Sequence, residues 1–181
     1  MKTPILSAEQ LTEGDFYALP HEVAFMESQV RDIKSKRVIL AGHIKDSMEQ
    51  SSETWHDNAP ADALFGELNM LDGRESKLAV AERRLTVVEY PDPDFSLVTI
   101  GTRVGCVISG SSFEIDVTGN LPLTLPADGE VETGSIAAPM PRALLGAEQE
   151  ASVEADINGR IIEIGIMSVD QTTQREFYES I

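Results

Sequence analysis

The spacing of apolar residues near the start of the chain is that of an α-helix. From about His21 to Met48, these residues recur in steps of three and four, which places them along one side of a helix. This first seam consists of Val23, Met26, Val30, Ile33, Arg37, Leu40 and Ile44. Arg37 is its polar member, and we expect its long side chain to reach the edge of the seam. At about 1.5 Å per residue, the predicted helix is roughly 40 Å long.

Helical spacing returns further along the chain. A second seam follows the same steps and consists of Leu64, Leu68, Leu71, Glu75, Leu78, Glu82 and Leu85. Two helical segments of similar length with a short polar connector are typical of an antiparallel hairpin, which we predict over residues 21–90. Gly66 and Gly73 each weaken the second helix by about 1 kcal/mol relative to Ala, so packing between the helices must hold it.

The connector between the two helices, residues 49–60, is polar, and Pro60 breaks the helical period there. Its acidic residues include Glu53 and Asp57, which are either solvated acids of a turn or a pair that steadies a metal ion. Between them, Trp55 is expected either to pack between the helix ends or to contact a partner. We call this connector the tip of the hairpin.

The pattern changes to that of short strands after Tyr90, beyond a Pro-rich linker over residues 91–96. Apolar and β-branched segments predict strands over residues 96–100, 103–108, 112–118, 130–137, 152–157 and 160–168. One short helix is expected over residues 141–146, and Asn158–Gly159 is the strongest hairpin signal in the chain. Residues 169–181 are expected to form a polar tail.

These elements predict an α+β chain. An N-terminal antiparallel helical hairpin is followed, over residues 97–168, by a small antiparallel β domain with one short helix. Residues 1–20 are expected to be irregular, apart from a capping box at Ser7 and Gln10 that favours a short helical turn. We expect the hairpin to act as a lever that presents its tip, and the β domain to be the part that docks.

The charge of the chain excludes some classes of partner. A net charge of −17 on 181 residues opposes bulk binding of duplex nucleic acid, and we expect no sequence-specific DNA binding. Most of the excess acid lies in residues 91–181, which hold 15 acidic and 4 basic residues. No apolar run approaches the ~20 residues that span a membrane, and we expect no signal peptide. Cys106 is the only cysteine, which fits a reducing cytoplasm.

Basic residues are concentrated on the first predicted helix. Five of the 14 Lys and Arg residues of the chain lie there: Arg31, Lys34, Lys36, Arg37 and Lys45. They form either an ordinary solvated face or a local stripe that guides a single strand of RNA. The sequence leaves both alternatives open.

Three short segments carry a resemblance to a known family. Residues 136–146 (Ile-Ala-Ala-Pro-Met-Pro-Arg-Ala-Leu-Leu-Gly) look like a Ser-Pro-x-x-Arg-x-Leu-x-Gly segment, and residues 100–104 (Ile-Gly-Thr-Arg-Val) match a Gly-x-x-Val strand. Residues 54–59 at the tip are similar to an Asp-Leu-x-Glu-Asn-Ala sequence. In these segments and their order, the chain resembles the Gre-type transcript cleavage factors of bacterial RNA polymerase.

The resemblance implies that the β domain is FKBP-like and docks on the rim of bacterial RNA polymerase. The residues that it places at this docking surface are Pro139, Met140, Pro141, Arg142 and Leu144. For Leu144 or Leu145 a core position is the favoured alternative, because one face of a short helix must be buried. It also implies that the hairpin is a coiled coil that enters the secondary channel of the polymerase and reaches the 3′ end of the nascent RNA. The chain is then not an enzyme itself, but a factor that acts on the catalytic centre of its partner.

At the tip, the resemblance implies that Glu53 and Asp57 help to hold a second Mg²⁺ and a water at the polymerase active centre, which stimulates cleavage of backtracked RNA. Mg²⁺ takes oxygen ligands, and two ions can stabilise the attacking and leaving oxygens. This metal is expected to be shared with the polymerase in the complex only, and no cofactor is expected to bind the chain stably alone. The residues expected to support the tip are Thr54, Trp55, His56 and Asn58.

The sequence departs from the family pattern at two places. Asp57 falls on the family's tip Glu, whereas the family's tip Asp falls on Thr54, which has no carboxylate. Glu53 is the available substitute, and it lies four positions before Asp57. If the tip turns as a helix, residues at this spacing lie on the same face. Ala138 replaces the family's Ser before Pro139.

Two other functions stay open. A Gre-like regulator of the same build would bind RNA polymerase and modulate or inhibit it without stimulating cleavage, and the altered tip favours this alternative. A peptidyl-prolyl isomerase is disfavoured, because that activity needs an aromatic-lined pocket. Residues 95–168 hold only Phe95 and Phe113 as aromatic residues.

Overall fold

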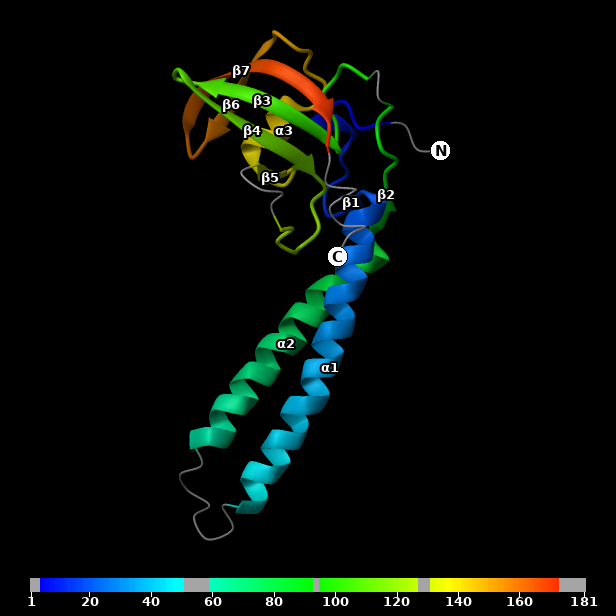
Figure 1. Ribbon diagram of the computed structural model, residues 1–181, viewed down its shortest axis with the longest axis vertical. Helices are drawn as coiled ribbons and strands as arrows, with labels where there is room; N and C mark the ends of the chain where they lie inside the picture. The colour runs from blue at the N-terminus through cyan, green and yellow to red at the C-terminus, as the bar shows by residue number, and fades with distance from the viewer. Residues whose placement is uncertain (1–3, 51–58, 93–94, 127–130, 173–181) are drawn as a thin grey trace. The chain divides into compact units, whose positions relative to one another are not determined.

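The computed structural model describes residues 4–50, 59–92, 95–126 and 131–172 (Figure 1). It divides into two compact units. We call Phe25–Arg83 the hairpin, and Met1–Ala24 together with Arg84–Ile181 the body. Within the described residues, no helix is long and apolar enough to cross a membrane.

Two long helices form the predicted hairpin. Helix α1 spans Pro20–Gln50 and helix α2 spans Ala59–Arg83, and the two run antiparallel (Figure 1). Buried side chains recur along both helices. They include the seam residues Met26, Ile33 and Ile44 on α1 and Leu78 on α2, together with Ala61 and Ala81, which lie outside the second seam. Helix α2 ends earlier than the second seam predicts, because Leu85 begins a short strand instead. The helical period in the sequence therefore located both helices correctly.

The two polar members at the centre of the seams meet each other. Arg37 Nε lies 2.9 Å from Asp72 Oδ1, and Arg37 Nη1 lies 2.5 Å from Glu75 Oε2. Arg37 therefore reaches across to α2, rather than to the edge of its own seam. A shift of one helical turn would move at least one of the two carboxylates out of reach of Arg37, so these ion pairs favour one register of the hairpin.

The body is built on a five-stranded sheet with the strand order β5-β4-β3-β7-β6. Its strands are β3 (Thr102–Ile108), β4 (Ser111–Thr118), β5 (Glu132–Ser135), β6 (Ser152–Ile157) and β7 (Arg160–Gln171). β4 and β5 are parallel, whereas the other neighbours are antiparallel, so the prediction of a wholly antiparallel sheet was wrong at this pair. Parallel neighbours need a crossover of about a dozen residues, and the long connection after β4 supplies it.

One short helix, α3 (Pro139–Leu144), packs against β5 and β6, as Figure 1 shows. The core beneath the sheet contains Val104, Cys106, Ile115, Val117, Ile136, Leu144, Ile164 and Ile166. Cys106 is completely buried, and this burial raises the pKa of its thiol to about 11. The burial of Cys106 confirms the prediction that it is a core residue.

Two loops of the body differ in how well the sequence predicted them. Asn158 and Gly159 both have positive φ, at 56° and 81°, and they join β6 to β7 as the Asn-Gly signal predicts. Residues 96–100 were expected to be a strand, but only Leu97 forms an isolated bridge, to Glu148. A short buried apolar run does not by itself distinguish a strand from a loop that is pinned to the core.

The segment before the hairpin contains more structure than the expected irregular chain. A 3₁₀ helix, η1, spans Ala8–Gln10, and the Ser7 N–H donates a hydrogen bond to Gln10 Oε1 at 3.2 Å, as the capping box predicts. Strand β1 (Phe16–Ala18) pairs in parallel with β2 (Leu85–Val87). The two strands that flank the hairpin in sequence are therefore joined within the body.

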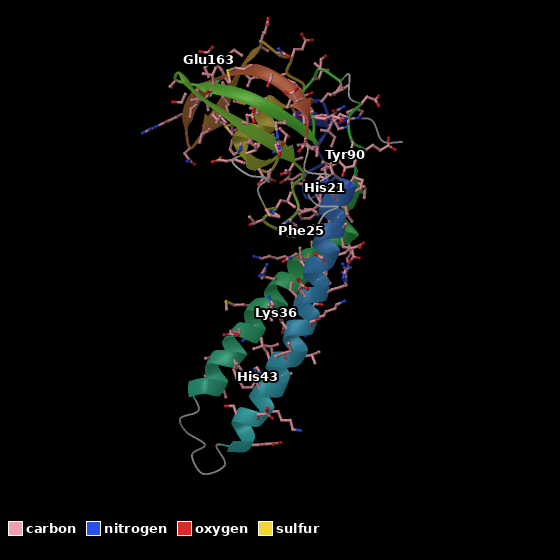
Figure 2. All side chains as sticks on the ribbon, in the orientation of Figure 1. His21, Phe25, Lys36, His43, Tyr90 and Glu163 are labelled. Carbon is pink, nitrogen blue, oxygen red and sulfur yellow. The ribbon has the colours of Figure 1, made fainter. Side chains whose placement is uncertain are left out.

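The side chains of His21 and Tyr90 contact each other near β1 and β2. His21 Nδ1 and the Tyr90 hydroxyl oxygen are 2.6 Å apart, and the two rings stack with centroids separated by 5.7 Å (Figure 2). His21 belongs to the first turn of α1, and Tyr90 follows β2. This contact adds a second connection between the two segments that flank the hairpin.

A buried carboxylate, Glu22, ties the first turn of α1 to the end of β4. Glu22 Oε2 accepts a hydrogen bond from the Leu19 N–H at 2.7 Å, and Oε1 accepts one from the Gly119 N–H at 2.9 Å. A Cβ atom on Gly119 would lie 2.0 Å from Tyr17 O and 2.7 Å from Glu22 Oε2, so no larger residue fits. The first bond is the helix-side half of a capping box, in which a Glu reaches back to the N-cap N–H.

Burial changes the acidity of this carboxylate. Glu22 is only 1% exposed, and desolvation raises its pKa from 4.5 to about 7, although the two N–H donors lower it. The folded chain therefore binds this proton more tightly than the unfolded chain. The stabilisation that protonation provides is complete below about pH 4.5 and is lost as the pH rises through about 7.

We predict that Glu22→Gln removes this part of the pH dependence. The difference in free energy of unfolding between the wild type and Glu22→Gln should change by up to roughly 3 kcal/mol between about pH 4.5 and 7. Urea unfolding at a series of pH values measures this difference, with Glu154→Gln, an exposed position, as the control. Parallel curves for the wild type and Glu22→Gln would contradict the prediction.

A second prediction concerns Arg37. Its side chain is 41% exposed, and those of Asp72 and Glu75 are 46% and 23% exposed, so solvent screens the ion pairs. We expect Arg37→Ala to lower the free energy of unfolding by about 1 kcal/mol at low salt and by less in concentrated salt. Urea unfolding followed by helical circular dichroism measures the loss.

The matched control for Arg37→Ala is Lys34→Ala, an exposed position on the same helix, which should change stability by less than about 0.5 kcal/mol. Exchange of the charges in the double variant Arg37→Glu, Glu75→Arg should recover part of the stability lost in Arg37→Glu alone. Purely additive effects of the two substitutions would rule out the cross-helix pairing.

Candidate functional site

The tip residues named by the sequence lie outside the described residues. They are Glu53, Thr54, Trp55, His56, Asp57 and Asn58, and their roles stay predictions. The described chain fixes where the tip begins and ends, because α1 ends at Gln50 and α2 begins at Ala59. Pro60 therefore lies inside the first turn of α2, where proline is tolerated because its missing N–H needs no helical partner. It marks the start of a helix rather than the end of the connector.

Side chains are packed close to both ends of the tip. Ile44 is 7% exposed on α1, and Ala61 is 3% exposed on α2. Both helices thus bury apolar surface within two turns of the tip. Such packing fixes the two points from which the tip emerges.

The helix ends add carboxylates that the sequence analysis did not single out. Asp46 and Glu49 near the end of α1 and Asp62 in the first turn of α2 are all exposed. Asp62 is favoured there, because acidic residues stabilise a helix N-terminus. Lys45 Nζ lies 3.8 Å from Glu49 Oε1, but both side chains are largely exposed, so this pair contributes little. The surroundings of the tip are therefore acidic on both helices.

No group of three His, Cys, Asp or Glu side chains that could hold a metal ion occurs within the described ranges. The acidic residues at the helix ends do not converge in this way. A metal site at this end of the hairpin therefore needs ligands from the tip, from a partner, or from both.

The five basic residues proposed as a stripe on α1 do not share one environment. Arg37 is paired with Asp72 and Glu75, whereas Arg31, Lys34 and Lys36 are exposed. By helical spacing, Arg31 and Lys34 share one side of α1, and Lys36 lies on another. The structure therefore leaves Arg31 and Lys34, with Lys45 three turns further along, as the residues that share a side.

The predicted docking segment coincides with α3, whose N-cap is Ala138. No side-chain hydrogen bond caps this helix, which is the direct result of Ala in place of the family's Ser. Among the residues expected to face a partner, Pro139 and Arg142 are exposed and Met140 is partly buried. Pro141 and Leu144 are buried, and Leu144 is completely so. Leu144 therefore belongs to the core, and the accessible part of this surface is Pro139, Met140 and Arg142.

A hollow of about 500 Å³ on the body bears on the isomerase alternative. It is formed along β3, β4, β5 and β7, and the one aromatic residue in its lining is Phe113. Phe113 also packs partly against the core. A single aromatic side chain does not make an aromatic-lined pocket, so this hollow gives the isomerase no support.

No family model matches the chain. The transcription elongation factor GreA of Lachnoclostridium phytofermentans is 24% identical over 154 residues, which cover 81% of this chain and 90% of that protein.

Two solved structures are similar. The GreA factor homolog 1 (Gfh1) protein of Thermus thermophilus has a TM-score of 0.39 at 16% identity and covers 86% of this chain and 98% of its own. The transcription elongation factor GreA/GreB of Nitrosomonas europaea has a TM-score of 0.33 at 28% identity and covers 55% of this chain and 78% of its own.

The two TM-scores are low, so the similarity to GreA is carried by the match in sequence. That match extends across the hairpin and the body, because it covers most of the chain. It agrees with the order of parts in the structure, in which a helical hairpin precedes an α+β body. The chain is therefore similar along most of its length to a Gre-type transcription elongation factor.

Proposed function

We propose that the chain binds bacterial RNA polymerase through its body and presents the hairpin tip to the active centre of the polymerase, where it stimulates cleavage of backtracked RNA. The observation that carries this proposal is the long antiparallel hairpin with carboxylates around its tip. The match to GreA over 90% of that protein supports it. We infer a cytoplasmic factor that is not itself an enzyme.

The dimensions of α1 suit this role. Its 31 residues give a length of roughly 45 Å, so the helix carries its last turn far from its first. The cross-helix ion pairs of Arg37 hold α2 beside it in one register. Two paired helices hold the tip in a defined position, which a single flexible segment would not do. Side chains of the tip can therefore act far from the first turn of α1.

The chemistry at the tip is assigned to Glu53 and Asp57. Mg²⁺ prefers oxygen ligands and keeps several waters, so carboxylates of the chain suit an ion that is shared with the polymerase. Bound there, the ion would stabilise charge that develops on the reacting phosphate. Glu49 and Asp62 at the helix ends increase the negative potential that attracts a cation.

The second candidate is a regulator that binds the polymerase and slows or modulates it without stimulating cleavage. Thr54 favours it, because this position lacks the carboxylate that the family pattern has there. In this case the tip would act by occupying space near the active centre. The two candidates share the partner and differ only in the chemistry of the tip.

Stalled, backtracked complexes of bacterial RNA polymerase provide the test. The wild-type chain should increase the release of short RNA fragments, and the double variant Glu53→Ala, Asp57→Ala should lower the cleavage rate at least ten-fold while polymerase binding is retained. The matched control is Glu49→Ala, which removes an exposed carboxylate at the end of α1 and should retain most of the activity.

A wild-type chain that binds the polymerase and slows elongation, but releases no RNA at any Mg²⁺ concentration, would reject the cleavage function in favour of the regulator. The substitution Thr54→Asp should then create cleavage stimulation, because it restores the carboxylate at the position of the family's tip Asp. No binding to the polymerase at all would reject both candidates.

The docking role of α3 gives a separate prediction. Arg142 is exposed, so Arg142→Glu should leave folding unchanged and weaken polymerase binding by roughly ten-fold, or about 1.4 kcal/mol. Fluorescence anisotropy with labelled chain measures the affinity. Arg160→Glu, an exposed arginine at the start of β7, is the control with the same change of charge. Equal affinities for the two variants would place the docking surface elsewhere.

A further inference from the structure

A hollow of about 630 Å³ lies between the two helices of the hairpin. Helix α1 contributes Lys36, Ile39 and His43 to its lining, and helix α2 contributes Glu67, Met70 and Arg74. On both helices these residues have the spacing i, i+3, i+7, so the hollow follows one side of each helix for two turns. Figure 2 labels Lys36 and His43 at either end of this stretch of α1.

The hollow is mostly apolar, and its apolar residues face water. Ile39 is 57% exposed and Met70 is 66% exposed, while Leu40, Leu64 and Leu71 line the floor and are partly buried. Scattered exposed apolar residues are normal, but here two large ones flank a continuous groove. A partner that covers these two side chains would remove their apolar surface from water, which favours binding.

Two positive charges flank one end of this groove. Lys36 and Arg74 are the direct neighbours of residues that take part in the Arg37 ion pairs, yet no ion pair found among the described residues uses either of them. Glu67 is the one acidic residue in the lining. In a chain of net charge −17, the groove therefore has a local excess of positive charge.

We propose that this groove binds an amphipathic α-helix of a partner protein, with apolar side chains on one face and carboxylates beside them. The i, i+3, i+7 spacing on both walls matches a third helix laid along the pair, and its apolar face would cover Ile39 and Met70. Its carboxylates would pair with Lys36 and Arg74, in partly desolvated positions where charge complementarity selects the partner.

Charge argues against the other occupants. A second copy of the chain would bring another −17 charges, which opposes association. A nucleic-acid strand is disfavoured because the groove has an apolar floor and offers only Lys36 and Arg74 to its phosphates, whereas such binding depends on several basic contacts. The proposal concerns the flank of the hairpin and not its tip, so it stands whether or not the chain stimulates RNA cleavage.

Two synthetic helical peptides test the proposal on the full-length chain. Both carry leucines at i, i+3, i+4 and i+7, and they differ only in flanking residues, which are glutamates in one and lysines in the other. Fluorescence anisotropy should show the glutamate peptide binding at least ten-fold more tightly. Met70→Gln should weaken the binding of this peptide, because it removes an apolar wall of the groove.

Charge reversal provides the decisive comparison. The double variant Lys36→Glu, Arg74→Glu should reverse the preference in favour of the lysine peptide. The control Arg31→Glu, Lys34→Glu makes the same change of charge on another side of α1 and should leave the preference unchanged. Circular dichroism verifies that each variant retains its helices.

The proposal is overturned if neither peptide binds, if both bind equally, or if the control double variant changes the preference as much as the groove variant does. It is also overturned if sedimentation shows self-association of the chain that Met70→Gln abolishes, since a second copy would then fill the groove. Because the assay contains no polymerase, its outcome does not depend on the proposed role in transcription.

Discussion

The ion pairs that Arg37 makes with Asp72 and Glu75 distinguish one alignment of the two hairpin helices from its neighbours. Few residues of the apolar seams are buried. Gly66 and Gly73 are not places of close helix contact, because a Cβ atom added at either would meet nothing within 4 Å. Apolar contacts favour helix pairing without selecting one alignment, because leucines recur at every turn. A charged side chain in one seam, matched by charges in the other, distinguishes the correct alignment from its neighbours. Any function at the tip requires that alignment, because the tip emerges from both helix ends.

Within the body, the buried carboxylate of Glu22 organises the start of α1. Glu22 accepts hydrogen bonds from the N–H groups of Leu19 and Gly119, which are far apart in sequence. Asn120 extends the network, because its side-chain oxygen accepts a hydrogen bond from the Tyr17 N–H. These contacts join the strand before the hairpin to the end of β4. They satisfy backbone groups that would otherwise be buried without a partner.

Local patterns in the sequence predicted the parts of the fold that local physics decides. The two helices follow from steps of three and four, and the β6–β7 turn follows from Asn158–Gly159, whose backbone takes the positive φ values that this dipeptide favours. The parallel pairing of β4 with β5 was missed, because it depends on a long crossover and not on either strand. Glu22 was missed for a related reason: its partner Gly119 is distant in sequence, and no spacing rule connects them. In the candidate site, the helix over Pro139–Leu144 was located from its motif. The sequence also predicted that Leu144 or Leu145 is core, and packing shows that both are buried.

Cys106 has a consequence for how the molecule can be observed. The only thiol in the chain is sealed within the sheet, and burial keeps its pKa near 11, so almost none of it is the reactive thiolate at neutral pH. A maleimide dye added to the natural sequence would find nothing to modify in the folded state. A single cysteine introduced on the surface would then carry a fluorophore alone, without prior removal of the native residue.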